Sequence, residues 1–187
     1  MYNIKLEYFT ELIMKLATDI KIPFPRPLVF STYRDNLMDV VNSLPNKNDL
    51  KLVSRRVEAD KVYTVYDWQS DEDIPALIEN ILKQDKLRWT EYDTWNNQDF
   101  TLDWQIKTQI FTESFQCSGK NTFLEDKNNT LIQTRGEIQL DPNKIDGIPD
   151  FLKTQLANLF EQILASKLEP NLIDMGKGVQ KYLEKNK

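Results

Sequence analysis

Apolar and polar residues alternate along much of the chain, and this pattern predicts strands. In the first such stretch Met14, Leu16, Ile20 and Ile22 alternate with mostly polar neighbours. A period of two is typical of a half-buried β-strand. The same pattern predicts further strands at about residues 49–58, 61–69, 86–95, 99–108, 112–124 and 129–140. Short polar breaks separate most of them, so consecutive strands are expected to pair antiparallel through hairpins.

Helical spacing follows the first strand. Pro27 suits the first turn of a helix, because its missing N–H would be unpaired there in any case, and the apolar residues after it predict a short helix. Asp35 is the expected N-cap of a second short helix, which Pro45 should end. The beginning of the chain is therefore expected to run strand, helix, helix.

Two later segments also have helical spacing. Residues 71–85, DEDIPALIENILKQD, predict an amphipathic helix between two strands. A broad apolar stripe predicts the longest helix of the chain, from Asp150 to about Leu168. Pro170 is expected to kink or break this helix before it resumes.

Composition narrows the classes of function. A chain of 187 residues with 40% hydrophobic residues fits one domain, over residues 1–187. The net charge of -5 argues against nucleic acid as a partner, because phosphate contacts need a basic surface. With no histidine and one cysteine, the usual nucleophile pairs and zinc sites are excluded, and neither a cofactor nor a metal is expected. The charged N-terminal segment resembles no secretory signal, so a soluble cytoplasmic protein is expected.

The order strand, two helices, further strands and long helix, with the phrase IPFPRPLVFSTYRDNLMDVV at 22–41, resembles the helix-grip fold of START-like and birch-pollen-allergen-like proteins, the SRPBCC superfamily. The resemblance covers about residues 12–186. It implies an α+β domain in which a curved antiparallel sheet of about seven strands wraps around the C-terminal helix. It also implies a deep apolar cavity for a lipid, polyketide, sterol or similar molecule.

The predicted helix at 71–85, with SRRVEADKVY before it, is also similar to the lid region of PRELI-like phospholipid-transfer proteins. The N-terminal strand departs from that group. As a lid, the helix would close over the cavity, or touch a membrane transiently, through Leu77, Ile78 and Ile81. The alternative is a helix docked permanently on the sheet edge. Arg55, Arg56 and Lys51 could meet an anionic headgroup at the cavity mouth, or simply be solvated.

The segment KLRWTEYDTW, at 86–95, places two carboxylates on the same face as two tryptophans. Burying Trp89 and Trp95 is worth more than burying a carboxylate costs, so this face should point inward. Glu91, in the middle of the strand, is the expected interior acid, whereas Asp93 is expected at the rim.

The next strands supply the other expected cavity walls. In DFTLDWQI the apolar alternation points Phe100, Leu102 and Trp104 inward. Gly119 and Gly136 would leave room for a cavity or, alternatively, mark bulges in a bent sheet. Cys117 is expected to be an inward small hydrophobe. The complete predicted lining is Trp89, Glu91, Trp95, Phe100, Leu102, Trp104, Phe115, Cys117, Leu156 and Phe160.

Three classes of function remain open from the sequence. The first is a non-enzymatic protein that binds or transfers a hydrophobic, lipid-like ligand, with Glu91 as its polar anchor. The second is an enzyme of cyclase or dehydratase kind, in which Glu91 and Tyr92 handle protons. The third is an adaptor whose interior is filled by side chains and whose surface binds another protein.

Overall fold

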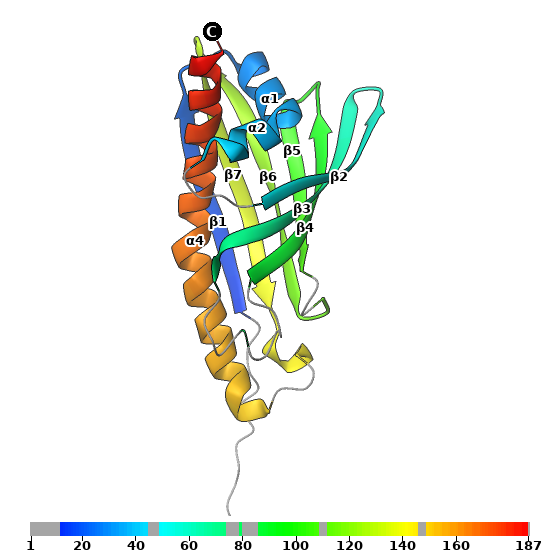
Figure 1. Ribbon diagram of the computed structural model, residues 1–187, viewed down its shortest axis with the longest axis vertical. Helices are drawn as coiled ribbons and strands as arrows, with labels where there is room; N and C mark the ends of the chain where they lie inside the picture. The colour runs from blue at the N-terminus through cyan, green and yellow to red at the C-terminus, as the bar shows by residue number, and fades with distance from the viewer. Residues whose placement is uncertain are drawn as a thin grey trace, which may run out of the picture.

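The computed structural model describes residues 12–44, 49–73, 79, 86–108, 112–145 and 149–186. Seven strands form one sheet and the helices lie against it (Figure 1). The elements are, in chain order, β1 (Leu12–Ile22), α1 (Arg26–Asp35), α2 (Leu37–Asn42), β2 (Asp49–Glu58), β3 (Lys61–Asp73), β4 (Lys86–Asn96), β5 (Thr101–Thr108), β6 (Phe115–Asp126), β7 (Asn129–Leu140), the 3-10 turn η1 (Pro142–Lys144) and α4 (Asp150–Lys185).

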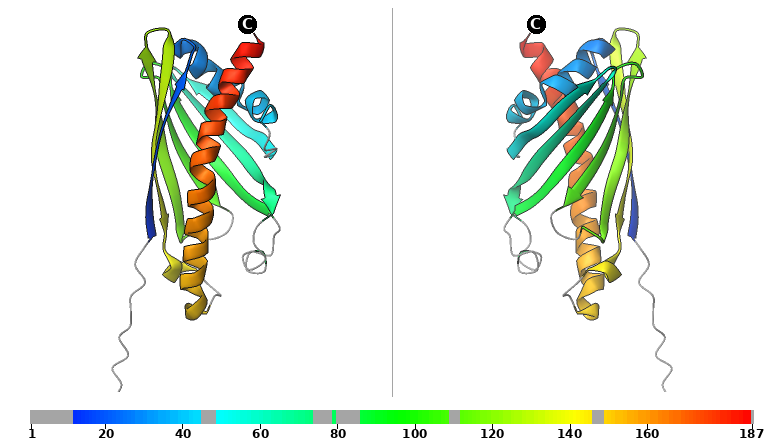
Figure 2. Two further views of the ribbon diagram at one scale, coloured as in Figure 1. Left: turned by 90° about the vertical axis from the view of Figure 1, so that its left-hand side faces the viewer. Right: turned by 90° about the vertical axis from the view of Figure 1, so that its right-hand side faces the viewer.

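The sheet is antiparallel throughout, with the order β1-β7-β6-β5-β4-β3-β2. Short connections join β2 to β3, β4 to β5 and β6 to β7 as antiparallel neighbours, as the polar breaks predict, whereas residues 74–85 separate β3 from β4. The one long-range pairing joins the two ends of the series, with Leu12 opposite Leu140 and Ile22 opposite Thr130. Figure 2 shows α4 lying across one face of this curved sheet, with α1 and α2 near its C-terminal end. The interior therefore lies between that face and the helices.

The long helix packs closely on β1. A Cβ atom on Gly176 would lie 2.7 Å from Cγ2 of Ile20, so a larger residue would push the helix away from the strand. Val179 is fully buried close by. The expected break at Pro170 is wrong, because α4 runs as one helix from Asp150 to Lys185. Proline removes one backbone hydrogen bond, a local cost that the packing of the following turns offsets.

The first two helices differ from expectation in one detail. Asp35 is the last residue of α1 and does not cap α2, whose N-cap position is Asn36 without a side-chain hydrogen bond. The Asp35 carboxylate instead accepts hydrogen bonds from Arg34 and, at 2.9 Å, from Arg55 of β2. A surface ion-pair network thus joins α1 to the edge of the sheet.

Aromatic rings fill the space between α1 and the sheet. The Phe30 ring makes edge contacts with Trp95 and Phe123, at 5.4 and 5.1 Å between ring centroids. All three side chains are at most 2% exposed. Edge-to-face packing of this kind adds to the free energy gained by burial. The interior is therefore solid at this end of the sheet.

The predicted helix at 71–85 cannot be compared in full. Strand β3 extends to Asp73, further than the sequence pattern indicated. Leu77, Ile78 and Ile81, the expected lid residues, lie outside the described residues. The lid and the alternative of a permanently docked helix both stay predictions.

Candidate functional site

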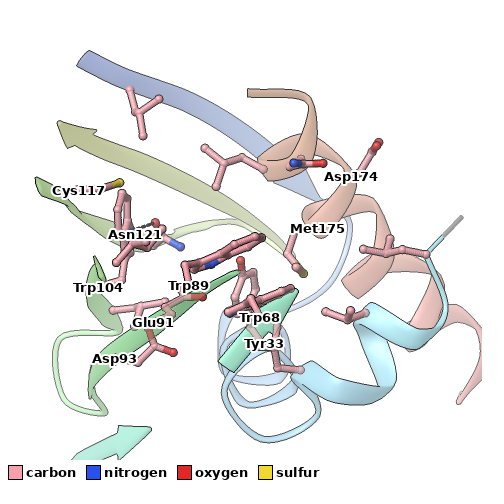
Figure 3. Close-up of a pocket in the computed structure, with 18 residues that line it drawn as sticks. Tyr33, Trp68, Trp89, Glu91, Asp93, Trp104, Cys117, Asn121, Asp174 and Met175 are labelled. Carbon is pink, nitrogen blue, oxygen red and sulfur yellow. Dashed lines mark hydrogen bonds between the residues drawn. The ribbon is translucent and has the colours of Figure 1, made fainter. Parts of the chain in front are cut away.

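A cavity of about 140 Å³ lies between the sheet and α4. In Figure 3 Glu91, Asp93, Trp104, Asn121 and Cys117 come from the strands, and Met175 approaches from α4. The described residues that line it are Leu16, Tyr33, Leu37, Val41, Leu44, Trp68, Trp89, Glu91, Asp93, Leu102, Trp104, Ile106, Cys117, Asn121, Asn171, Leu172, Asp174 and Met175. Its walls are mostly apolar and aromatic, with a few polar groups, which is the usual character of a small-molecule site.

Two carboxyl groups lie side by side in this cavity. Glu91 and Asp93 are two residues apart on β4, so the alternation of the strand turns both to the interior face. Asp93 is only 4% exposed, which corrects the expectation that it lies at the rim. Glu91 is half-buried. Asp93 was expected at the rim because the end of the strand would meet solvent, whereas Phe30 and Tyr33 of α1 cover that end by packing on Trp95.

A short hydrogen-bond chain holds Asp93. The Trp95 indole N–H donates to the Thr64 hydroxyl at 3.3 Å, and that hydroxyl donates to Asp93 Oδ2 at 3.2 Å. A hydroxyl can accept one bond and donate another, so the chain has a fixed direction and ends on an acceptor. The second oxygen, Oδ1, is buried and receives no hydrogen bond from an N–H or hydroxyl donor of the described residues.

Burial raises the pKa of both carboxyl groups. It raises the pKa of Glu91 to about 7, and nearby Trp68 and Asp93 offset part of the effect. It raises the pKa of Asp93 well above its usual range, and the Glu91 charge raises it further. The Trp68 indole N–H approaches Glu91, yet is buried without a hydrogen bond of ordinary geometry. Two carboxyl groups this close cannot both ionise cheaply, so the pair holds a shared proton near neutral pH.

The charges of Glu91 and Asp93 also shift the pKa values of neighbouring side chains. Burial, with the nearby Glu91 and Asp93 charges, raises the pKa of Tyr33 and raises that of Tyr66 to about 12. Burial and the Glu91 charge also raise the pKa of Cys117 to about 12. The thiol therefore stays protonated at neutral pH, which makes it a poor nucleophile. No lysine or arginine occurs among the described residues that line the cavity.

The two glycines of β6 and β7 make room for a side chain. Gly119 and Gly136 are paired across the strands, and Gly119 also faces Trp104 of β5. A Cβ atom on Gly119 would lie 2.3 Å from Cζ2 of Trp104, and one on Gly136 would lie 2.7 Å from its Cη2. The indole ring thus occupies the space that the glycines leave, and its N–H donates to Asn121 Oδ1 at 3.1 Å. The bulges expected as an alternative occur elsewhere in the described sheet, between Leu52 and Ser54 and between Gln69 and Asp73.

Two tryptophans form another wall. Trp68 and Trp89 face each other across β3 and β4, and their rings stack at 5.7 Å with an interplanar angle of 7°. The same pair also lines a second hollow, of about 400 Å³, with Leu50, Arg88 and other residues at the ends of these strands. The stacked rings thus lie between the cavity and a more polar surface.

The predicted lining is only partly brought together. Trp89, Glu91, Leu102, Trp104 and Cys117 line the cavity. Trp95 and Phe100 lie outside it because α1 covers that end of the sheet, with the Phe30 ring packed on both side chains. Phe115 lies outside it at the other end of β6, in the core beside Leu140. The side chains of Leu156 and Phe160 lie outside the described residues.

Some cavity residues were missing from the predicted set. Trp68 lines the cavity from the same face of β3 as the buried Thr64, and the alternation of 61–69 could have revealed that face. Tyr33 comes from α1, and no local pattern shows that a helical residue will reach β4. Conversely, Arg55 and Arg56 do not line the cavity: Arg55 pairs with Asp35, and Arg56 pairs with Glu58.

The chain from Trp95 to Asp93 can be tested by replacing Thr64 with valine. Thr64→Val keeps the shape but leaves an indole donor and a carboxylate acceptor buried without partners, so we expect the free energy of unfolding to fall by about 1–3 kcal/mol. Urea denaturation at pH 7 measures the change. Thr122→Val, a half-buried position on β6, is the control, and an equal loss there would contradict the role of the chain.

Neither the protein-family models nor the curated proteins contain a match to this chain. Solved structures do match. The Zhui aromatase/cyclase from Streptomyces sp. R1128 has a TM-score of 0.63 and 11% identity, over 92% of this chain and 94% of that one. Norcoclaurine synthase from Thalictrum flavum, in complex with dopamine and hydroxybenzaldehyde, has a TM-score of 0.62 and 10% identity, over 95% and 90%. TTHA0849 from Thermus thermophilus has a TM-score of 0.60 and 17% identity, over 90% and 95%.

These structures share the curved antiparallel sheet and the long C-terminal helix. The chain has the helix-grip fold. The fold class predicted from the sequence is thereby confirmed. At these identities the likeness establishes the helix-grip fold alone, because one fold supports many activities.

Neither a candidate metal site nor a candidate membrane-spanning helix occurs in the described part of this helix-grip domain. Among the described residues, no group of three or more histidine, cysteine, aspartate or glutamate side chains is arranged to hold a metal ion. Within the same part of the chain, no helix is both long enough and apolar enough to cross a bilayer.

Proposed function

We propose that this protein binds a hydrophobic small molecule between the sheet and α4 and carries it without transforming it. The observation that carries the proposal is the cavity of about 140 Å³, which has aromatic walls and a buried carboxyl pair. Among structures of the same fold, norcoclaurine synthase holds dopamine and hydroxybenzaldehyde, which are small molecules. The cavity also weakens the adaptor alternative, which required an interior filled by side chains.

The size of the cavity limits the part of a ligand that it can hold. An engineered cavity of roughly 150 Å³ binds benzene, so about 140 Å³ accommodates a group the size of one ring. A lipid chain would extend beyond this space. Lipid transfer, transient membrane contact and a cytoplasmic location therefore stay predictions drawn from the sequence.

Native mass spectrometry of protein purified from cells tests the proposal. We expect a bound mass that solvent extraction releases. Ile106→Trp fills the cavity from β5 and should abolish the bound mass, whereas Gln105→Trp, on the exposed face of the same strand, should retain it. If the wild-type protein shows only the apo mass and Ile106→Trp leaves the binding of apolar probes unchanged, the proposal is wrong.

An enzymatic role is the second candidate, because the shared proton of Glu91 and Asp93 could serve acid–base chemistry. A carboxyl group with a pKa of about 7 can both donate and accept a proton at neutral pH. Incubation of the extracted ligand with fresh protein distinguishes the candidates. A chemically changed ligand with the wild-type protein, and an unchanged but still bound ligand with Glu91→Gln, would favour the enzyme.

A further inference from the structure

We propose that the cavity selects a ligand that carries a protonated amine next to an aromatic ring, with the ammonium group between Glu91 and Asp93. This inference rests on the proposed function, which it deepens by naming the class of ligand. It depends on the charge of the cavity, on one unsatisfied oxygen and on the aromatic walls.

The ionisable groups among the described lining residues include carboxyl groups but no lysine or arginine. The carboxyl groups are those of Glu91, Asp93 and Asp174. Asp174 has a cation of its own, since Lys177 Nζ lies 3.4 Å from Oδ1. Among the described residues, no arginine or lysine shifts the pKa of Glu91 or of Asp93. The pair on β4 therefore has no counter-ion among the described residues, and an anionic ligand would meet no compensating cation there.

Asp93 supplies an independent indication of a ligand. Its side chain is 4% exposed, and Oδ1 receives no hydrogen bond from an N–H or hydroxyl donor of the described residues. Among the described residues, a proton carried by Glu91 is the donor that could reach this oxygen. A buried acceptor without a donor costs free energy, so a ligand that brings a donor is favoured over one that does not. An ammonium group brings three N–H donors and a positive charge.

The aromatic residues around the pair suit the rest of such a ligand. Trp68, Trp89, Trp104 and Tyr33 all line the cavity, and Figure 3 shows the two stacked tryptophans between the strand carboxyl groups and Met175 of α4. Tryptophan faces attract cations as well as apolar groups. The described volume has room for one ring. The carboxyl pair, the aromatic walls and the volume of the cavity therefore all favour a small arylalkylamine as the ligand.

Binding of the cation should release a proton. Burial raises the pKa of both carboxyl groups, so the pair retains a proton near neutral pH, and an ammonium group between them stabilises both in the ionised form. The amine keeps its own proton, so the shared proton leaves for the buffer. The heat of binding will then depend on the ionisation enthalpy of the buffer, with up to about one proton released for each amine bound.

Three probes of equal length separate charge from shape: 2-phenylethylamine, 2-phenylethanol and phenylacetate, each titrated calorimetrically into the full-length protein at pH 7.5 in phosphate and in Tris. We expect the amine to bind at least about tenfold more tightly than the alcohol, with proton release, and phenylacetate to bind most weakly. Equal or tighter binding of the alcohol or of phenylacetate would overturn the inference.

Variants locate the effect. Glu91→Gln combined with Asp93→Asn should remove the preference for the amine and its proton release while 2-phenylethanol still binds, which also shows that the variant is folded. Asp103→Asn changes an exposed carboxylate on β5 and should behave as the wild type. If the double variant does not fold, the wild-type series still decides the inference.

The two proposals fail in different ways. A cellular ligand in native mass spectrometry without a preference for the amine rejects the inference and leaves the proposed function standing. Absence of a cellular ligand together with no binding of any of the three probes rejects both.

Discussion

Replacing Glu91 with glutamine is expected to remove much of the loss of stability that the wild-type protein suffers as the pH rises from about 4.5 to 7.5. The pKa of Glu91 is raised from 4.5 in a model carboxyl group to about 7 in the folded protein. Between these values the folded state binds more protons than the unfolded state, so the free energy of unfolding falls with increasing pH. Below the window both states are protonated, and above it both are ionised. The shift corresponds to on the order of 3 kcal/mol.

Urea denaturation from pH 4.5 to 8 measures this difference. The free energy of unfolding of Glu91→Gln, relative to that of the wild type, should increase as the pH rises. Asp93 should increase this difference further, because removal of the Glu91 charge lowers the pKa of Asp93. Glu184→Gln makes the same chemical change at an exposed position of α4 and should keep the wild-type slope. A slope in Glu91→Gln equal to that of the wild type would mean that Glu91 is not protonated in the folded state.

The fold was predictable because local signals agree with it. The alternation in β1 and in β4–β7 appears directly in the sequence, and short polar turns impose antiparallel hairpins. The sequence signals that gave wrong predictions are at Pro170 and Asp35, where tertiary contacts outweigh local preference. Pro170 normally interrupts a helix, but the close packing of the following turns, with Gly176 on Ile20, keeps α4 continuous. Asp35 is a good N-cap residue, yet it pairs with arginines instead.

The sequence predicted which strand residues face the interior, but not how deeply each of them is buried. Strand parity correctly turned Glu91, Asp93 and the tryptophans of β4 inward. The burial of Asp93 was not predictable, because α1 covers it and no local sequence pattern gives the position of α1. For the same reason Tyr33 was missed and Trp95 was expected to line the cavity. The glycines of β6 and β7 were understood as free space, whereas the Trp104 ring from β5 occupies it.

That arrangement leads to the second large expected effect, at Gly119. In Gly119→Ala the new Cβ atom would lie 2.3 Å from Cζ2 of Trp104 and 2.5 Å from the carbonyl oxygen of Arg135. The second neighbour is backbone, so the strands as well as the indole ring must shift. Overpacking of this kind typically costs about 1–3 kcal/mol, and the displaced ring also strains its 3.1 Å hydrogen bond to Asn121. We expect a loss of about 3 kcal/mol, measured by urea denaturation.

The cause of that loss can be separated by a double-mutant cycle. Trp104→Leu removes the ring that meets the new methyl group, so Gly119→Ala with Trp104→Leu should lose less stability than the sum of the two single variants. Ser118→Ala, at the exposed neighbouring position of β6, should change the free energy of unfolding by no more than about 0.5 kcal/mol. Additive losses in the cycle would place the clash in the strand backbone. Wild-type stability of Gly119→Ala would instead show that the ring does not rest on Gly119, and that the wall beside Asn121 is open to a ligand.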